Sequence, residues 1–228
     1  VYDVGGEAAK WFVATAIAGH LLEINPFDEP NVQESKDRTK ALLSEYARER
    51  RFREEPPVCE EPPVAVYGEA DTGASAELSG RLHAFFRRLR PGDYAVLLSF
   101  LPRTPALDRA AETLRERLGA RLGVATMLGF GPRYLHSTGQ LYKGGPDSGL
   151  FLLLTAEERD DLPIPGAPFS FGTLKRAQAL GDFEALREKG RRILRLHLRG
   201  DLDQAVSHLL RSVEDACTTM RPRATRQA

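Results

Sequence analysis

One stretch of the sequence, Gly129–Pro146, gathers polar side chains that are suited to binding a small phosphorylated or hydroxylated molecule. It follows an apolar run that ends at Leu128, and ligands in open α/β sheets collect outside the carboxyl ends of strands. The candidate ligand-binding side chains, which lie among five glycines, are Arg133, His136, Ser137, Thr138, Gln140 and Lys143. Cationic and hydroxyl donors match phosphate oxygens, and His136 can exchange a proton with a sugar oxygen. The alternative is an ordered turn whose polar groups satisfy its own backbone.

A second candidate is Lys36, which follows the turn Asn25–Pro30 and belongs to a helix expected from about Asn31 to Arg50. A lysine in the second turn lies near the positive end of the helix dipole, which favours an anionic substrate nearby. Without further context, an isolated lysine on a charged helix face is a solvated side chain.

The residues around Lys36 provide that context. The sequence Asn25-Pro26-Phe27-Asp28-Glu29-Pro30-Asn31-Val32-Gln33-Glu34-Ser35-Lys36 resembles the C-terminal signature of phosphoglucose isomerases. In that family the lysine assists ring opening of the hexose phosphate, so the resemblance implies this catalytic role for Lys36. The family usually has Gln where this chain has Glu29, which we include as a substrate-binding candidate. Glu29 can also pair with Lys36 or weaken phosphate affinity.

The resemblance implies an enzyme of glycolysis and gluconeogenesis that interconverts glucose 6-phosphate and fructose 6-phosphate through an enediol. The reaction needs a general base, which in the family is a Glu that precedes the motif. Only one helix precedes the motif here, so we expect the base upstream of this chain and an inactive isolated fragment. Gly129–Pro146 and the run Phe169–Lys175 are also similar to segments of bacterial fusions of transaldolase with phosphoglucose isomerase. The implied partners are a hexose phosphate, an upstream isomerase domain, a transaldolase domain and further copies of the chain.

Composition excludes several classes of protein. The 228 residues contain 32 basic and 32 acidic side chains, so no global field attracts nucleic acid or an anionic membrane. No apolar run approaches the roughly 20 residues of a membrane-spanning helix. The two cysteines, Cys59 and Cys217, form neither a disulfide framework nor a Cys/His metal cluster, which favours the reducing cytoplasm. We expect no metal and no cofactor, and no glycine-rich nucleotide-binding motif follows any expected strand.

Hydrophobic patterns then indicate the elements that position these residues. Helical spacing predicts a helix from Gly6 to Leu22, and further helices and strands alternate from Val64 onward in a βαβαβ pattern. Apolar runs such as Leu150–Leu154 are typical of strands buried on both faces, whereas Ile193–Leu198 alternates less cleanly and indicates an edge strand. We therefore predict an α/β protein in which two helices end a sugar-isomerase (SIS-like) domain and a mainly parallel three-layer α/β module follows.

The expected domain boundaries follow from these elements. Residues 1–50 form the isomerase helices, 51–63 a Pro-rich charged linker, 64–217 the α/β module and 218–228 a tail. The competing hypothesis is that the α/β module is non-catalytic and binds a sugar phosphate or holds subunits together.

Overall fold

The computed structural model describes residues 3–28, 30–69, 75–158 and 160–218. The chain forms two compact units, Val1–Pro30 and Asn31–Ala228. Glu29 and most of the expected tail lie outside the described residues.

The first unit contains helix α1 (Val4–Leu21), as its helical spacing predicts. Its large apolar side chains, among them Trp11, Phe12 and Ile17, are exposed. The turn after the helix is held by the Asn25 side chain, whose Oδ1 accepts a hydrogen bond from the amide of Phe27 at 3.1 Å. Asparagine commonly stabilises turns in this way, because its side chain reaches the backbone two residues on.

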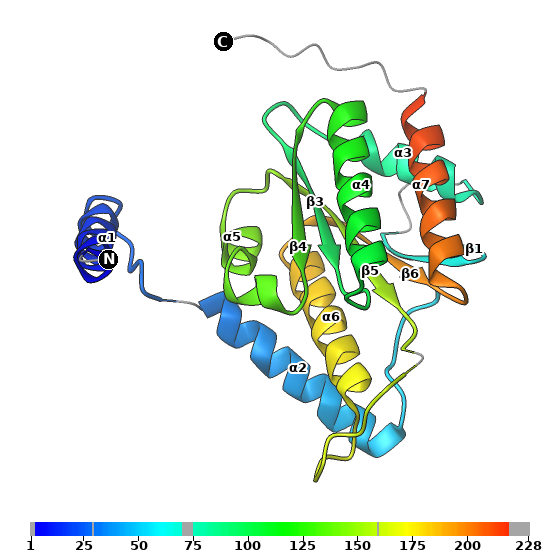
Figure 1. Cartoon of the computed structure of the whole chain (residues 1–228), viewed down its shortest axis with the longest axis horizontal. Coiled ribbons are helices and arrows are strands. Elements are labelled where there is room, and N and C mark those ends of the chain that lie inside the picture. Colours follow the sequence, from blue (N-terminus) through cyan, green and yellow to red (C-terminus); the bar gives the residue numbers. More distant parts are fainter. Residues whose placement is uncertain (1–2, 29, 70–74, 159, 219–228) are drawn as a thin grey trace. The chain divides into compact units, whose positions relative to one another are not determined.

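The second unit is built on a six-stranded sheet with the order β1-β2-β6-β5-β3-β4 (Figure 1). The strands are β1 (Cys59–Glu61), β2 (Val64–Gly68), β3 (Tyr94–Ser99), β4 (Ala125–Phe130), β5 (Gly149–Ala156) and β6 (Arg192–Leu198). The four strands β6, β5, β3 and β4 are parallel, and β2 and β1 extend the sheet antiparallel beside β6. The mainly parallel α/β fold predicted from the sequence is therefore confirmed.

Two sequence expectations about this sheet are wrong. Strand β6 is not an edge strand, because it pairs with β2 on one side and β5 on the other. The expected linker also contains a strand, since β1 lies within residues 51–63 and forms the sheet edge. Polar residues recur along both segments, and a polar strand face resembles a solvent-exposed one when only the sequence is read.

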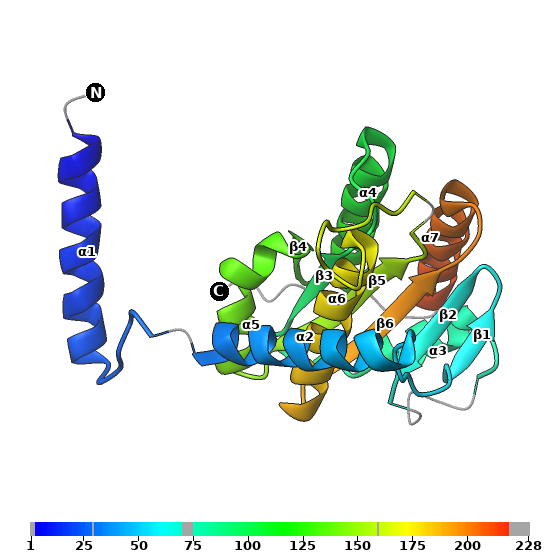
Figure 2. The same ribbon diagram turned by 90° about the horizontal axis from the view of Figure 1, so that it is seen from below.

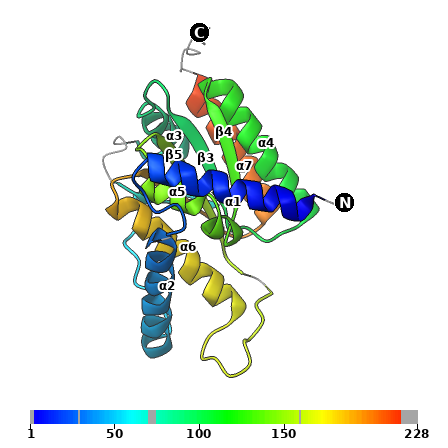
Figure 3. The ribbon, with the colours of Figure 1, turned by 90° about the vertical axis from the view of Figure 1, so that its left-hand side faces the viewer.

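Helices cover both faces of the sheet and make three layers. Helices α3 (Leu78–Phe86), α4 (Pro105–Leu122) and α7 (Leu202–Thr218) pack on one face over the larger apolar core. Helix α6 (Phe171–Glu188), the short α5 (Gly139–Gly144) and the 3₁₀ turn η1 (Arg133–His136) pack on the other face over the smaller core. Figure 3 shows strands between α4 and α7 on one side and α6 on the other.

The sequence pattern predicts the start of α4 but does not predict α6. Thr104 accepts a hydrogen bond from the amide of Leu107 and caps α4, as its Thr-Pro start predicts. The sequence pattern indicates no element for residues 171–188, where α6 forms. The buried residues of this helix occupy most positions from 177 to 186 and include Gly181 and Asp182, so helical periodicity is faint.

Helix α2 (Pro30–Glu49) belongs to the second unit and packs on α6 (Figure 2). The contact is close at Gly181 of α6, where an added Cβ would lie 3.4 Å from the Cβ of Arg38. Arg38 donates a 2.8 Å hydrogen bond to Glu188, and Lys189 lies 3.0 Å from Glu34. Compact packing thus divides the chain at Pro30, earlier than the expected boundary near Arg50, while the origin of residues 1–50 in an isomerase domain stays a prediction.

Candidate functional site

The Gly129–Pro146 segment is folded into η1 and α5, and it presents its polar side chains unequally. Arg133, His136 and Ser137 are exposed, whereas Thr138 and Gln140 are half-buried. Three candidates are therefore open to solvent on a short 3₁₀ turn and the residue that follows it.

Lys143, the sixth candidate in this segment, is buried with only 3% of its surface exposed. Its ammonium forms an ion pair with Asp182 of α6, and the Tyr134 hydroxyl donates to the same carboxylate. Burial, followed by the negative charge of Asp182, raises the pKa of Tyr134 well above its ordinary value. The structure thus gives Lys143 a packing role, because a ligand would reach it only by breaking this ion pair.

The glycines of the segment allow close packing. A Cβ on Gly131 would lie 2.4 Å from ring atoms of Phe100, which is far inside van der Waals contact. Phe100 in turn makes an edge contact with Tyr134, with ring centroids 5.9 Å apart. At Gly131, glycine is therefore required by the fit of the segment against the sheet, with no need for a phosphate.

The start of α2 lies against α5. The backbone amide of Asn31 donates to Oε1 of Gln140 at 3.2 Å, and a Cβ on Gly144 would lie 2.8 Å from the Asn31 side-chain nitrogen. Lys36 lies in the second turn of α2, and its side chain is exposed. The two segments singled out from the sequence are therefore neighbours in the fold.

A polar cavity of about 370 Å³ lies elsewhere, at the carboxyl ends of β5 and β6. Strand ends, the first turns of α6, the loop after β5 and the end of α2 all line it. Its lining includes Tyr46, Phe52, Phe100, Thr155, Glu157, Glu158, Asp161, Thr173, Lys175, Arg176, Arg195 and His197. The chain leaves β3 toward β4 and leaves β5 toward β6, so the sheet reverses its winding between β3 and β5. Phe100, which follows β3, and Thr155 of β5 both line the cavity, so it adjoins this switch point, where open α/β sheets bind ligands.

Two polar residues of β5 and β6 meet in the wall of this cavity. Nδ1 of His197 lies 3.0 Å from the Thr155 hydroxyl, and both residues are buried. Burial, followed by the positive charges of Arg195 and Arg176, lowers the pKa of His197 to about 4. His197 is therefore a neutral hydrogen-bonding group at physiological pH. These residues are not among the candidates from the sequence, because nothing in the sequence shows that their strand ends are adjacent.

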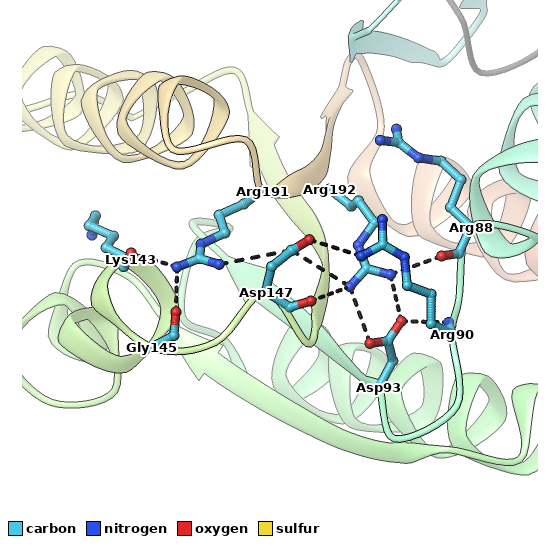
Figure 4. Close-up of polar contacts among 8 residues, drawn as sticks. All are labelled: Arg88, Arg90, Asp93, Lys143, Gly145, Asp147, Arg191 and Arg192. Carbon is cyan, nitrogen blue, oxygen red and sulfur yellow. Dashed lines mark hydrogen bonds and ion pairs between the residues drawn. The ribbon is translucent and has the colours of Figure 1, made fainter.

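The amino edge of the sheet holds a separate polar cluster (Figure 4). Arg192, at the start of β6, donates to both oxygens of Asp93 at 2.5 and 3.2 Å and to the carbonyl of Arg88. Arg191 donates to the carbonyls of Lys143 and Gly145. Burial raises the pKa of Asp93, but hydrogen bonds from Arg192 and the amide of Arg90 outweigh it and lower the net pKa. These contacts are all made within the chain, and they tie the strand starts together.

Other kinds of site find no support in the described part of the chain. No group of three or more His, Cys, Asp or Glu side chains there is placed to hold a metal ion. Cys59 and Cys217 are both buried free thiols, and burial raises the pKa of Cys217 to about 11. Within the same residues, every helix is too short or too polar to cross a membrane.

Comparisons with known proteins bear on the fold. No family model and no curated protein matches this sequence. Among solved structures, the chain is similar to the hypothetical protein TT0462 from Thermus thermophilus, with a TM-score of 0.56 and 20% sequence identity. The similarity covers 64% of this chain and 40% of that one. At this identity the likeness shows a shared fold alone.

Proposed function

We propose that this chain is the C-terminal part of a cytoplasmic glucose-6-phosphate isomerase and contributes Lys36 to ring opening of the sugar. The observation that carries the proposal is the Asn-Pro-Phe-Asp turn followed by a helix that presents Lys36 to solvent in its second turn. The Asn25 side chain holds that turn through its hydrogen bond to Phe27. An ammonium near the helix start suits a phosphorylated substrate, because the dipole favours negative charge there.

The chemistry also needs a base that moves a proton between the two sugar carbons. In this proposal a Glu outside residues 1–228 is that base, and Lys36 acts on the ring oxygen. The proposed reaction therefore needs neither a metal nor a cofactor.

The test replaces Lys36 in the natural polypeptide that carries this chain. We expect Lys36→Ala to reduce kcat for conversion of fructose 6-phosphate to glucose 6-phosphate by at least roughly 100-fold, which is the usual scale of general acid-base catalysis. Lys40→Ala is the matched control, because Lys40 is an exposed lysine one turn further along α2. Wild-type turnover in Lys36→Ala would refute the proposal.

The second candidate function is that of a ligand-binding module without catalysis. The cavity at the carboxyl ends of β5 and β6 favours it, because this cavity lies entirely within the second unit and does not include Lys36.

A further inference from the structure

Arg195 is the least expected side chain of the sheet. It lies in the middle of β6, and only 2% of the residue is exposed. Its guanidinium carbon lies 3.8 Å from the centroid of the Tyr67 ring and 5.8 Å from that of Phe183. Burying a charge in a sheet is costly unless the charge is paired. The group that pairs with Arg195 therefore indicates which kind of ligand this position can bind.

That partner is Glu54, which lies on the segment 51–57 between α2 and β1, here called the strap. One carboxylate oxygen of Glu54 accepts from Arg195 and the other accepts from Arg176 of α6. Two guanidinium groups thus share a single carboxylate, which leaves one positive charge uncompensated. Two oxygens of one phosphate group can bridge the same two donors, and a phosphate dianion would balance both charges.

The rest of the cavity lining is mixed in charge, with Glu157, Glu158 and Asp161 beside Lys175. Burial, followed by the positive charges of Arg195 and Arg176, lowers the pKa of His197 even though Glu54 is in place, so the charge of the arginine pair reaches His197. Two of the other charged side chains of the lining have partners of their own: Lys175 pairs with Glu158, and Asp161 accepts from the Gly172 amide at 2.7 Å. The buried Arg195 and the more exposed Arg176 are thus the two cations of this lining that share a single carboxylate, and they are the place for an added anion.

The strap reaches this position from outside regular structure. Residues 51–57 form neither helix nor strand, and the strap is held by side-chain contacts. Arg195 lines both the 370 Å³ cavity and a neighbouring cavity of about 510 Å³, and Glu54 lines the second. Release of Glu54 would therefore open the two arginines to a ligand without rearranging the sheet.

We propose that Arg176 and Arg195 form the anion subsite of a binding site for a small phosphate ester, and that Glu54 occupies this subsite when the ligand is absent. His197 and Thr155 then offer hydrogen bonds to the rest of the ligand, beside the aromatic rings of Phe52 and Phe100. The proposal deepens the second candidate function and is independent of Lys36. Its readout is phosphate affinity, whereas that of the isomerase proposal is turnover.

The test measures binding of inorganic phosphate to the full chain by isothermal titration calorimetry, with potassium chloride holding the ionic strength constant. We expect Glu54→Gln to bind phosphate at least roughly tenfold more tightly than the wild type, because a closed strap reduces apparent affinity by the fraction of open molecules. Glu55→Gln is the matched control: Glu55 is the neighbouring strap carboxylate, and it pairs with Arg187 at 3.0 Å. It should bind phosphate as the wild type does.

Adding Arg176→Gln to Glu54→Gln should abolish the gain, since it removes one of the two donors. Unchanged affinity in Glu54→Gln, or a gain that survives in the double variant, would overturn the proposal. A second measurement needs no variant: saturating phosphate should accelerate tryptic cleavage of the wild-type strap at Arg51 and Arg53, because a released strap is more accessible to the protease. Strap cleavage that is unaffected by saturating phosphate would count against the proposal equally.

Discussion

At the scale of single residues, burial decides what the charged side chains do. Lys143 and Arg195 are both cations beneath the surface, but their partners differ in kind. Asp182 is fixed on a helix in the packed core, whereas Glu54 lies on a strap without regular structure. The first pair therefore acts as a structural clasp, and the second can open without unfolding the core.

The clasp gives a prediction about stability. Asp182→Asn leaves the buried Lys143 ammonium without a counter-charge, so we expect unfolding to require about 3–5 kcal/mol less free energy in urea titrations. The triple variant Lys143→Met, Asp182→Leu, Tyr134→Phe removes all three polar groups together and should recover much of that loss. Glu188→Gln, which breaks an ion pair at a largely exposed carboxylate, should cost less than about 1 kcal/mol. A loss below about 1 kcal/mol in Asp182→Asn would show that Lys143 is not a structural residue.

At the scale of elements, α2 carries Lys36 and contacts the Gly129–Pro146 segment. Its first turn bonds Gln140, and its middle packs on α6 where Gly181 allows the helices to approach. The strap then leads from the end of α2 to the Arg176–Arg195 pair. A shift of α2 would consequently move both its contact with α5 and its part of the lining of the 370 Å³ cavity.

The α2–α6 contact gives a prediction in which two substitutions have opposite effects. Gly181→Ala should be neutral or raise the melting temperature slightly, because the added Cβ only touches Arg38 and alanine favours helix by about 0.5–1 kcal/mol. Gly181→Leu should lower the melting temperature and expose α2 to limited proteolysis, since a larger side chain separates the helices. Equal melting temperatures for the alanine and leucine variants would contradict the close packing.

At the scale of the whole molecule, the position of the unit boundary is itself testable. We expect a chain that starts at Asn31 to unfold cooperatively, because the second compact unit comprises residues 31–228. A chain that starts at Arg51 loses α2 and its ion pairs to α6, and its melting temperature should fall by at least about 5 °C. Calorimetry compares the two chains directly. Identical melting temperatures would instead favour the boundary near Arg50 that the sequence pattern suggests.

The sequence by itself determined the α/β class, the parallel core strands and the capped start of α4, because each follows from local patterns of apolar residues and turn formers. It also supplied the motif around Lys36, whose role remains a proposal. It could not show that β6 is central. Ile193, Arg195 and His197 lie on one face of β6, and the leucines between them face the larger core. Because two of these three residues are polar, their face resembles a solvent-exposed one in the sequence.

Only the tertiary structure decided what those polar residues face. Parallel strands far apart in sequence end side by side, and this adjacency places Thr155, His197 and Arg195 around one cavity, while the strap brings Glu54 to Arg195. The same packing buries Lys143, which the sequence presents as one more cation in a polar loop. Local composition fixes which elements form, whereas long-range strand pairing and helix docking decide which charges are buried together.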